Sequence, residues 1–189
     1  MPVQIGAKVH NFTDPTHLLS DCHRRIEMFL GILEGVAEII DRPPSEEVIR
    51  SLASALRYFS EAAPKHNADE EESLFPRLHR LQSSEVQSVL AKLDQLEEEH
   101  CWAAPLHARI KRLGEQYISA GHLCAAEVDA FRSDVALLAM MYTHHIEIED
   151  RTVFPLADRL LSDLDKSAIA GEMAKRRRVA IVTGHEIPA

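Results

Sequence analysis

The sequence predicts an all-α protein, an up-down-up-down antiparallel four-helix bundle with a short additional C-terminal helix. Ala, Leu and Glu dominate a composition that is 46% hydrophobic but only 5% aromatic, with 7 glycines in 189 residues. This composition is typical of helices and disfavours a β-sandwich or β-barrel. Apolar residues also recur at three- and four-residue spacing along several long stretches, which indicates helices with one buried face. Finally, the second half of the chain repeats the pattern of the first.

The first helix is expected at residues 15–40. Asp14 can cap its start, and Pro15 suits the first helical position. Arg42-Pro43-Pro44 ends the helix, because proline cannot continue the helical hydrogen bonding. Residues 1–13 lack helical periodicity and are expected to form an N-terminal arm. The predicted helix carries an apolar stripe that should face the core: Ile26, Phe29, Leu30, Leu33, Val36, Ala37 and Ile40.

The second helix should open after Ser45, an N-cap residue followed by two glutamates. Pro64 lies inside this helix and is expected to kink or loosen the preceding turn. The helix then continues to about residue 81, with a bend at Pro76. Its apolar stripe includes Val48, Leu52, Leu56 and Phe59.

Two further long helices and a shorter one complete the prediction. The third begins after Ser83, bends at Pro105 and ends at Gly121, a residue suited to a helix C-terminus. The fourth runs from about residue 125 through Pro155. Ser162 opens a shorter helix that reaches about residue 178, with a capping box in which Asp165 replaces the usual glutamate. We therefore expect one helical domain over residues 14–178 and a tail at 179–189.

Bulk composition excludes several classes of function. The formal net charge of −9 argues against nucleic acid as a partner, since phosphate requires a basic surface. Cys22, Cys101 and Cys124 form no CxxC pair and are odd in number, which favours a reducing compartment over a disulfide framework. No signal peptide or membrane span is recognisable, so a cytoplasmic, soluble protein is expected. Eleven histidines is a high number for this length.

A duplicated motif concentrates the candidate chemistry. His66 and Glu70 stand four residues apart, with Phe75-Pro76 following, and the same pattern returns 79 residues later as His145, Glu149 and Phe154-Pro155. Residues four apart lie on one face of a helix, so each pair offers an imidazole and a carboxylate to one point. Each half also carries a lone histidine on its preceding helix. These two histidines, His23 and His100, are related by an offset of 77 residues.

The helix order brings these residues to one level of the bundle. In an antiparallel hairpin, residues equidistant from the loop lie at the same height. The midpoints between successive histidines fall at Pro43-Pro44, Ser83 and His122, all in predicted loops. Burying the imidazoles and carboxylates unpaired would cost several kcal/mol, which a metal would remove. Six ligands exceed one tetrahedral zinc site, and a mixed His/carboxylate set with two bridging carboxylates suits a pair of iron, manganese or zinc ions.

Over roughly residues 15–178, the sequence resembles the hemerythrin-like (HHE cation-binding) domains. The resemblance rests on CHRRIEMFLGIL, HNADEEESLFPRL, Glu99-His100 and HIEIEDRTVFPL. It implies a four-helix bundle with an oxo- or hydroxo-bridged non-haem di-iron centre, in which zinc or manganese can substitute. The two glutamates of the implied ligand set would bridge the ions. That set comprises His23, His66, Glu70, His100, His145 and Glu149.

One position departs from the oxygen-carrying hemerythrins of invertebrates. Those proteins carry a second histidine four residues after the histidine of the third helix, where this chain has Ala104. The sequence therefore resembles the bacterial branch with four histidines and two glutamates. One ion then has fewer nitrogen ligands and a more open coordination sphere. This difference disfavours reversible oxygen carriage and favours reaction chemistry or sensing.

The resemblance implies a protein that binds or reacts with a small ligand such as O2, NO or peroxide. The alternatives are an iron-, oxygen- or redox-sensing regulatory module, and a di-iron enzyme for peroxide or NO detoxification or for iron donation. Whether the protein is an enzyme stays open at this stage. Neither nucleic acid nor a membrane is an expected partner. A homodimer also stays open, because an exposed apolar stripe cannot be distinguished from a core stripe by sequence.

Three residues beside the ligand set have candidate supporting roles. Glu99 precedes His100 and can line a channel or relay protons, or it can simply belong to a solvated acidic face. Tyr142 lies one turn before His145 and can donate a hydrogen bond to a bound ligand or pack as a core tyrosine. His144 is rotated by about 100° from His145 on the helix, so it is expected beside the ligand shell or exposed.

Overall fold

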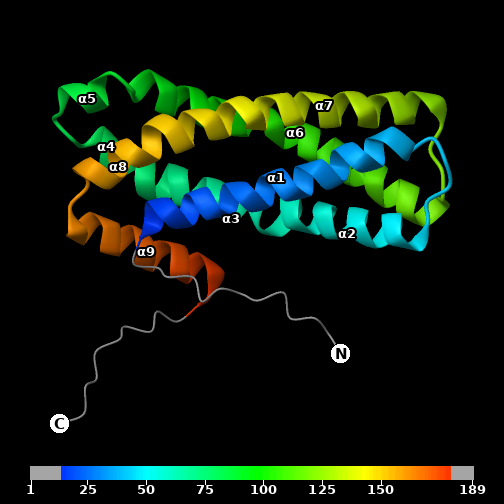
Figure 1. The fold of residues 1–189 in the computed structure, drawn as a ribbon, viewed down its shortest axis with the longest axis horizontal. Helices are drawn as coiled ribbons and strands as arrows, with labels where there is room; N and C mark the ends of the chain where they lie inside the picture. Colours follow the sequence, from blue (N-terminus) through cyan, green and yellow to red (C-terminus); the bar gives the residue numbers. More distant parts are fainter. Residues whose placement is uncertain (1–13, 180–189) are drawn as a thin grey trace, which may run out of the picture.

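The computed structural model describes residues 14–179, which form a long bundle of antiparallel helices (Figure 1). The predicted all-α fold class is confirmed. The expected arm at 1–13 and residues 180–189 of the expected tail lie outside the described residues. The elements are, in order, α1 Pro15–Ile39, α2 Glu46–Glu61, α3 Ala63–Asp69, η1 Glu70–Leu74, α4 Phe75–His79, α5 Ser84–Gln87, α6 Leu90–Ala120, α7 Ala125–Ile148, η2 Glu149–Val153, α8 Phe154–Leu160 and α9 Asp163–Arg177.

The predicted helix ends are confirmed where a capping residue defines them. The Asp14 side chain accepts a hydrogen bond from the His17 N–H at 3.0 Å, and Pro15 occupies the first position of α1. Ser162 accepts one from the Asp165 N–H at 3.1 Å and so opens α9. Gly121 ends α6 with φ +74°, a left-handed conformation that costs glycine little.

Two of the predicted long helices are interrupted. As expected from Pro64, the second helix breaks between α2 and α3. The prediction of one continuous helix from residue 84 is wrong, because α5 ends at Gln87 and α6 begins at Leu90. Val86 and Val89 are buried at this break in a small cluster with Leu156 of α8. The packing of these side chains against α8 therefore interrupts the helix for two residues.

Both copies of the duplicated motif contain a π-helical segment that the sequence analysis did not predict. In η1 the Phe75 N–H bonds to the Glu70 carbonyl, and in η2 the Phe154 N–H bonds to the Glu149 carbonyl. The next residue in each copy is a proline, which has no N–H and whose ring clashes with the carbonyl four residues back in an α-helix. The wider π turn relieves this clash and begins, in each copy, at the motif glutamate.

A polar layer divides the interior into two apolar clusters. One cluster lies along α1, α2, α6 and α7, and the other joins the start of α1 to α4, α8 and α9. On α1, His23 lies between Leu19 of the second cluster and Ile26 of the first. The candidate site therefore occupies the one level at which these two apolar clusters are separated by buried polar side chains.

Candidate metal centre

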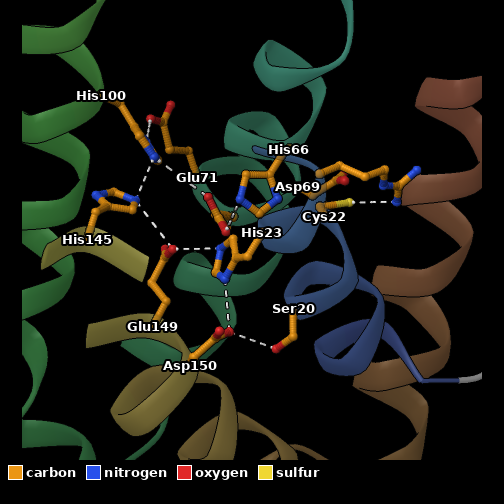
Figure 2. A network of polar contacts seen from close by, with 12 residues as sticks. Ser20, Cys22, His23, His66, Asp69, Glu71, His100, His145, Glu149 and Asp150 are labelled. Atoms are coloured by element: carbon orange, nitrogen blue, oxygen red, sulfur yellow. Dashed lines mark hydrogen bonds and ion pairs between the residues drawn. The ribbon is translucent and has the colours of Figure 1, made fainter. Parts of the chain in front are cut away.

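The structure brings all six predicted donor residues together in this polar layer (Figure 2). Each of them is buried, with no more than 7% of its surface exposed. The two glutamates are the first residues of the π segments, so the widened turns set their direction into the bundle. The donors are His23 of α1, His66 of α3, Glu70 of η1, His100 of α6, His145 of α7 and Glu149 of η2.

The donor atoms fall into two groups. In the first group, His23, His66, Glu70 and Glu149 each offer one atom, and these atoms lie within 4.8 Å of one another. In the second group, Glu70, His100 and His145 satisfy the same condition. Glu70 belongs to both. The two groups therefore lie next to each other and share one ligand side chain.

Each glutamate reaches a histidine of both groups. Glu149 Oε2 lies 3.1 Å from Nε2 of His23 and 3.3 Å from Nε2 of His145. The two oxygens of Glu70 face different histidines. Oε1 lies 3.2 Å from Nε2 of His66, and Oε2 lies 3.7 Å from Nε2 of His100. Two carboxylates placed between two pairs of imidazoles form the arrangement expected of ligands that bridge a pair of metal ions.

The fit of a metal pair can be tested on the buried polar atoms. All four carboxylate oxygens of Glu70 and Glu149 are buried, and neither they nor Nε2 of His23 make a hydrogen bond of good geometry with a described residue. An unsatisfied buried polar group costs about 1–3 kcal/mol, and a buried charge costs more. One atom of each of these three residues belongs to the first donor group, in which the atoms lie within 4.8 Å of one another. Coordination to cations would satisfy them together, so the residues present fit a metal centre.

Comparison with known proteins agrees with this geometry. The family model of the hemerythrin HHE cation-binding domain matches residues 14–157. The chain belongs to this family. An uncharacterised protein of Haemophilus influenzae is 24% identical over 169 residues, which cover 89% of this chain and 92% of that protein. The family match takes in all six donor residues and supports metal binding at the buried His/Glu groups.

The two glutamates of this hemerythrin-like domain differ in their electrostatics. Burial, together with the nearby charges of Glu149 and Asp69, raises the pKa of Glu70 well above its usual range. Burial would also raise the pKa of Glu149, but its contacts with His145 and His23 outweigh burial and lower this pKa. Two carboxylates cannot both ionise cheaply at this separation inside the protein. Cations between them would remove that conflict.

Three of the four histidines are oriented by a second carboxylate. Nδ1 of His23 contacts Asp150 at 2.9 Å, Nδ1 of His100 contacts Glu71 at 2.6 Å, and Nδ1 of His145 contacts Glu99 at 2.9 Å. An ionised carboxylate only accepts hydrogen bonds, so Nδ1 of each imidazole carries a proton, and in the neutral form that a metal ligand requires this is the only ring proton. Nε2 is then left with a free lone pair directed at the donor groups, which is the tautomer that a metal ligand needs.

Glu71 and Asp150 were not predicted as residues of the site. Each directly follows the glutamate of its motif copy, so the two acids are related by the same 79-residue offset. Their contacts cross between the halves, because Glu71 binds a histidine of the second half and Asp150 one of the first (Figure 2). A repeated acid next to each bridging glutamate was the available signal. The pairing with a distant helix needed the three-dimensional structure.

The three candidate supporting residues have different environments. Glu99 holds Nδ1 of His145, so it lies in the outer shell rather than on a fully solvated face. The Tyr142 hydroxyl lies 3.0 Å from Nε2 of His107 and is buried. His144 is exposed and, within the described part of the chain, has no polar contact with the donor groups.

A second buried acid anchors α9 next to the site. Asp69, which directly precedes Glu70, is fully buried. Its Oδ1 accepts a hydrogen bond from Arg176 at 2.9 Å, and its Oδ2 lies 2.5 Å from Nη2 of Arg177. These two arginines therefore join α9 to the segment that carries Glu70.

Proposed function

We propose that this domain binds two iron ions, bridged by Glu70 and Glu149, and that the pair binds or reacts with a small ligand such as oxygen, nitric oxide or peroxide. The observation that supports this most directly is the set of orphaned buried carboxylate oxygens between two pairs of imidazoles. Nitrogen and carboxylate donors together suit iron, and zinc or manganese could occupy the same donors. When bound, the ions would supply redox chemistry and Lewis acidity that no side chain offers.

The protein residues would hold, orient and shield this centre. The four imidazoles and two carboxylates supply the donors, and the three outer carboxylates fix the imidazole tautomers. The apolar clusters on either side of the polar layer limit access of water. Within residues 14–179, no helix has both the length and the apolar character that a membrane crossing requires.

Metal analysis of the full-length chain is the direct test. We expect protein produced with iron to contain about two ions per chain, because the donors define two neighbouring positions. Elemental analysis of the protein, together with its absorption spectrum, measures both stoichiometry and identity. Protein that contains no metal, or a single zinc ion, would contradict the proposal.

The outer carboxylates provide a second test. Replacing Asp150 by Asn or Glu71 by Gln removes the charged acceptor for Nδ1 of one ligand histidine and leaves the donors intact. We expect metal affinity to fall by about 10- to 100-fold in each variant, the usual cost of losing such a partner. Competition with a chelator measures the change. Glu147→Gln is the control, since this exposed residue pairs only with Arg151 among the described residues, and it should leave metal affinity unchanged.

The pKa of His23 makes metal uptake dependent on pH. Burial alone would lower this pKa, but the contacts with Asp150 and Glu149 raise it from 6.5 to about 9. In the metal-free protein His23 is therefore protonated at pH 7 and must lose a proton before Nε2 can bind metal. We expect uptake at pH 7 to release protons, and metal affinity to rise with pH until about 9. Calorimetry in buffers of different ionisation enthalpy counts the protons; uptake without release would contradict this.

One experiment separates binding from catalysis. The reduced, iron-loaded protein is mixed first with oxygen and then with hydrogen peroxide, while the absorption spectrum is followed. A reversible colour change supports ligand carriage, and sustained consumption of peroxide supports an enzyme. A spectrum that changes once, without turnover or reversal, supports the sensing alternative, in which the oxidation state of the ions is the signal.

A further inference from the structure

A pocket of about 290 Å³ lies beside the second donor group and reaches one of its members. His100, one of the three donors of that group, lies on its lining together with the buried Tyr142. Pro64 and Ala104 also line the pocket and are exposed, so they mark its outer end. The pocket therefore connects solvent with a side chain that belongs to the metal centre.

The lining of this pocket restricts what it can accept. Among the residues that the structure describes, the lining contains no acidic side chain and no lysine or arginine; its polar residues are Asn67, His100, His107 and Tyr142. The remaining lining is apolar and includes Phe59 and alanines. Since a pocket for a drug-sized ligand starts at about 300 Å³, this one suits a small molecule. The absence of charge on the lining favours an uncharged ligand over an anion such as phosphate.

The His107–Tyr142 pair leaves one hydrogen-bond donor unused. Burial lowers the pKa of His107 to about 4, so the imidazole is neutral and carries one N–H. If that proton is on Nε2 it is donated to Tyr142, and the tyrosine O–H is free. If it is on Nδ1, the tyrosine donates to Nε2 and the Nδ1–H is free. In either tautomer, the pair can donate one hydrogen bond to a third group.

The second ion would have room for an external ligand. His100 and His145 would hold it together with the two glutamates, since Glu70 lies 3.7 Å from His100 and Glu149 lies 3.3 Å from His145. Four side chains leave coordination positions of an iron ion free for an external ligand. A molecule that enters through this pocket would therefore arrive on the His100 side of the centre.

We propose that this pocket is the route and binding site of a small uncharged ligand for the second ion, and that the His107–Tyr142 pair donates a hydrogen bond to that ligand. This inference rests on the proposed metal pair. Under this proposal, ligands exchange on the His100 side of the centre, and Tyr142 and His107 position the bound ligand. Asn67 lines the same pocket and offers a further amide donor.

Obstruction of the pocket tests the route. Nitric oxide serves as an uncharged diatomic probe, mixed with the full-length, iron(II)-loaded protein in a stopped-flow spectrometer. Ala104→Phe places a large side chain at the outer end of the pocket, and we expect association to slow at least tenfold with metal content unchanged. Ala91→Phe is the matched control, because Ala91 is exposed on the same helix and does not line the pocket.

The outcomes separate the two proposals. If the wild-type protein takes up no metal, the proposed function fails and this inference fails with it. If the wild-type protein is fully loaded but Ala104→Phe binds nitric oxide at the wild-type rate, only the pocket assignment is overturned. Slowing in Ala104→Phe together with equal slowing in Ala91→Phe would also count against the pocket, because the effect would not depend on position.

Removal of the hydroxyl tests the positioning role. Tyr142→Phe retains the ring and eliminates one member of the pair, so we expect nitric oxide to dissociate about fivefold faster, as for the loss of one neutral hydrogen bond. The infrared N–O stretch gives a second readout that packing alone would not move. We expect a frequency shift in D2O for the wild-type protein and none for Tyr142→Phe/His107→Phe, which retains no N–H or O–H of the pair. Identical dissociation rates and identical isotope shifts in the wild-type and variant proteins would overturn the assignment.

Discussion

Replacing Glu70 by alanine is expected to reduce metal uptake from about two ions per chain to fewer than one, because this residue belongs to both donor groups. Its two oxygens face His66 on one side and His100 on the other. Loss of the side chain therefore removes a ligand from each ion and the bridge between them. His66→Ala affects only the first group and should leave one ion bound. Elemental analysis of the two variants measures this difference.

The control for this variant is Glu72→Ala. Glu72 lies in the same π segment, is exposed and pairs with Arg176 rather than with a donor histidine. The Glu72→Ala substitution changes the net charge by the same amount as Glu70→Ala, and the variant protein should retain both ions. Full metal occupancy in Glu70→Ala would refute the role of Glu70 as a shared ligand. Loss of one ion from Glu72→Ala would show instead that metal content responds to any disturbance of the π segment.

Stability measurements separate loss of the site from misfolding. In the metal-free wild-type protein, the carboxylate of Glu70 is buried without a hydrogen-bond partner, which costs about 1–3 kcal/mol. Glu70→Gln preserves the size of the side chain and cannot become the anionic ligand that a metal requires. We therefore expect metal-free Glu70→Gln to melt at or above the temperature of metal-free wild type, while only the wild type gains stability when iron is added. A variant that melts far lower without metal would indicate a structural role for the carboxylate.

The helical periodicity and the caps were sufficient to predict the bundle. Asp14, Ser45 and Ser162 each cap a helix through their own side chain, so the sequence records these boundaries locally. The break between α5 and α6 depends instead on Val86 packing against α8, a contact between residues far apart in the chain. The π segments were likewise not predicted, since a proline in a helix indicates a distortion without specifying its form.

The site was more predictable than its surroundings. Duplication and equal spacing from the loops placed the six donors on one level, and the structure brings those residues together. The carboxylates that contact Nδ1 of the ligand histidines were harder to predict. Their contacts cross between the halves, as in Asp150 with His23, and depend on how the helices are rotated relative to one another. The same holds for Tyr142, whose partner His107 comes from a different helix.

A large loss of stability is expected when the contacts between α9 and the site are removed. In Arg176→Ala/Arg177→Ala, the fully buried carboxylate of Asp69 loses both of its cationic partners. Removing the partners of a buried charge costs about 3–5 kcal/mol, so we expect the free energy of unfolding to fall by that amount. Urea denaturation of the metal-free protein measures this change. Lys175→Ala, at an exposed neighbouring position, should shift the free energy of unfolding by no more than about 0.5 kcal/mol.

A third substitution identifies the cause of this loss. If the uncompensated charge of Asp69 is responsible, then Asp69→Asn added to the double arginine variant should recover part of the lost stability, because a neutral amide is less costly to bury. No recovery would show that the arginine stems contribute mainly by packing. Asp69 also directly precedes Glu70. We therefore expect the double variant to release iron to a chelator faster than wild type, because the segment that carries the shared ligand is no longer held against α9.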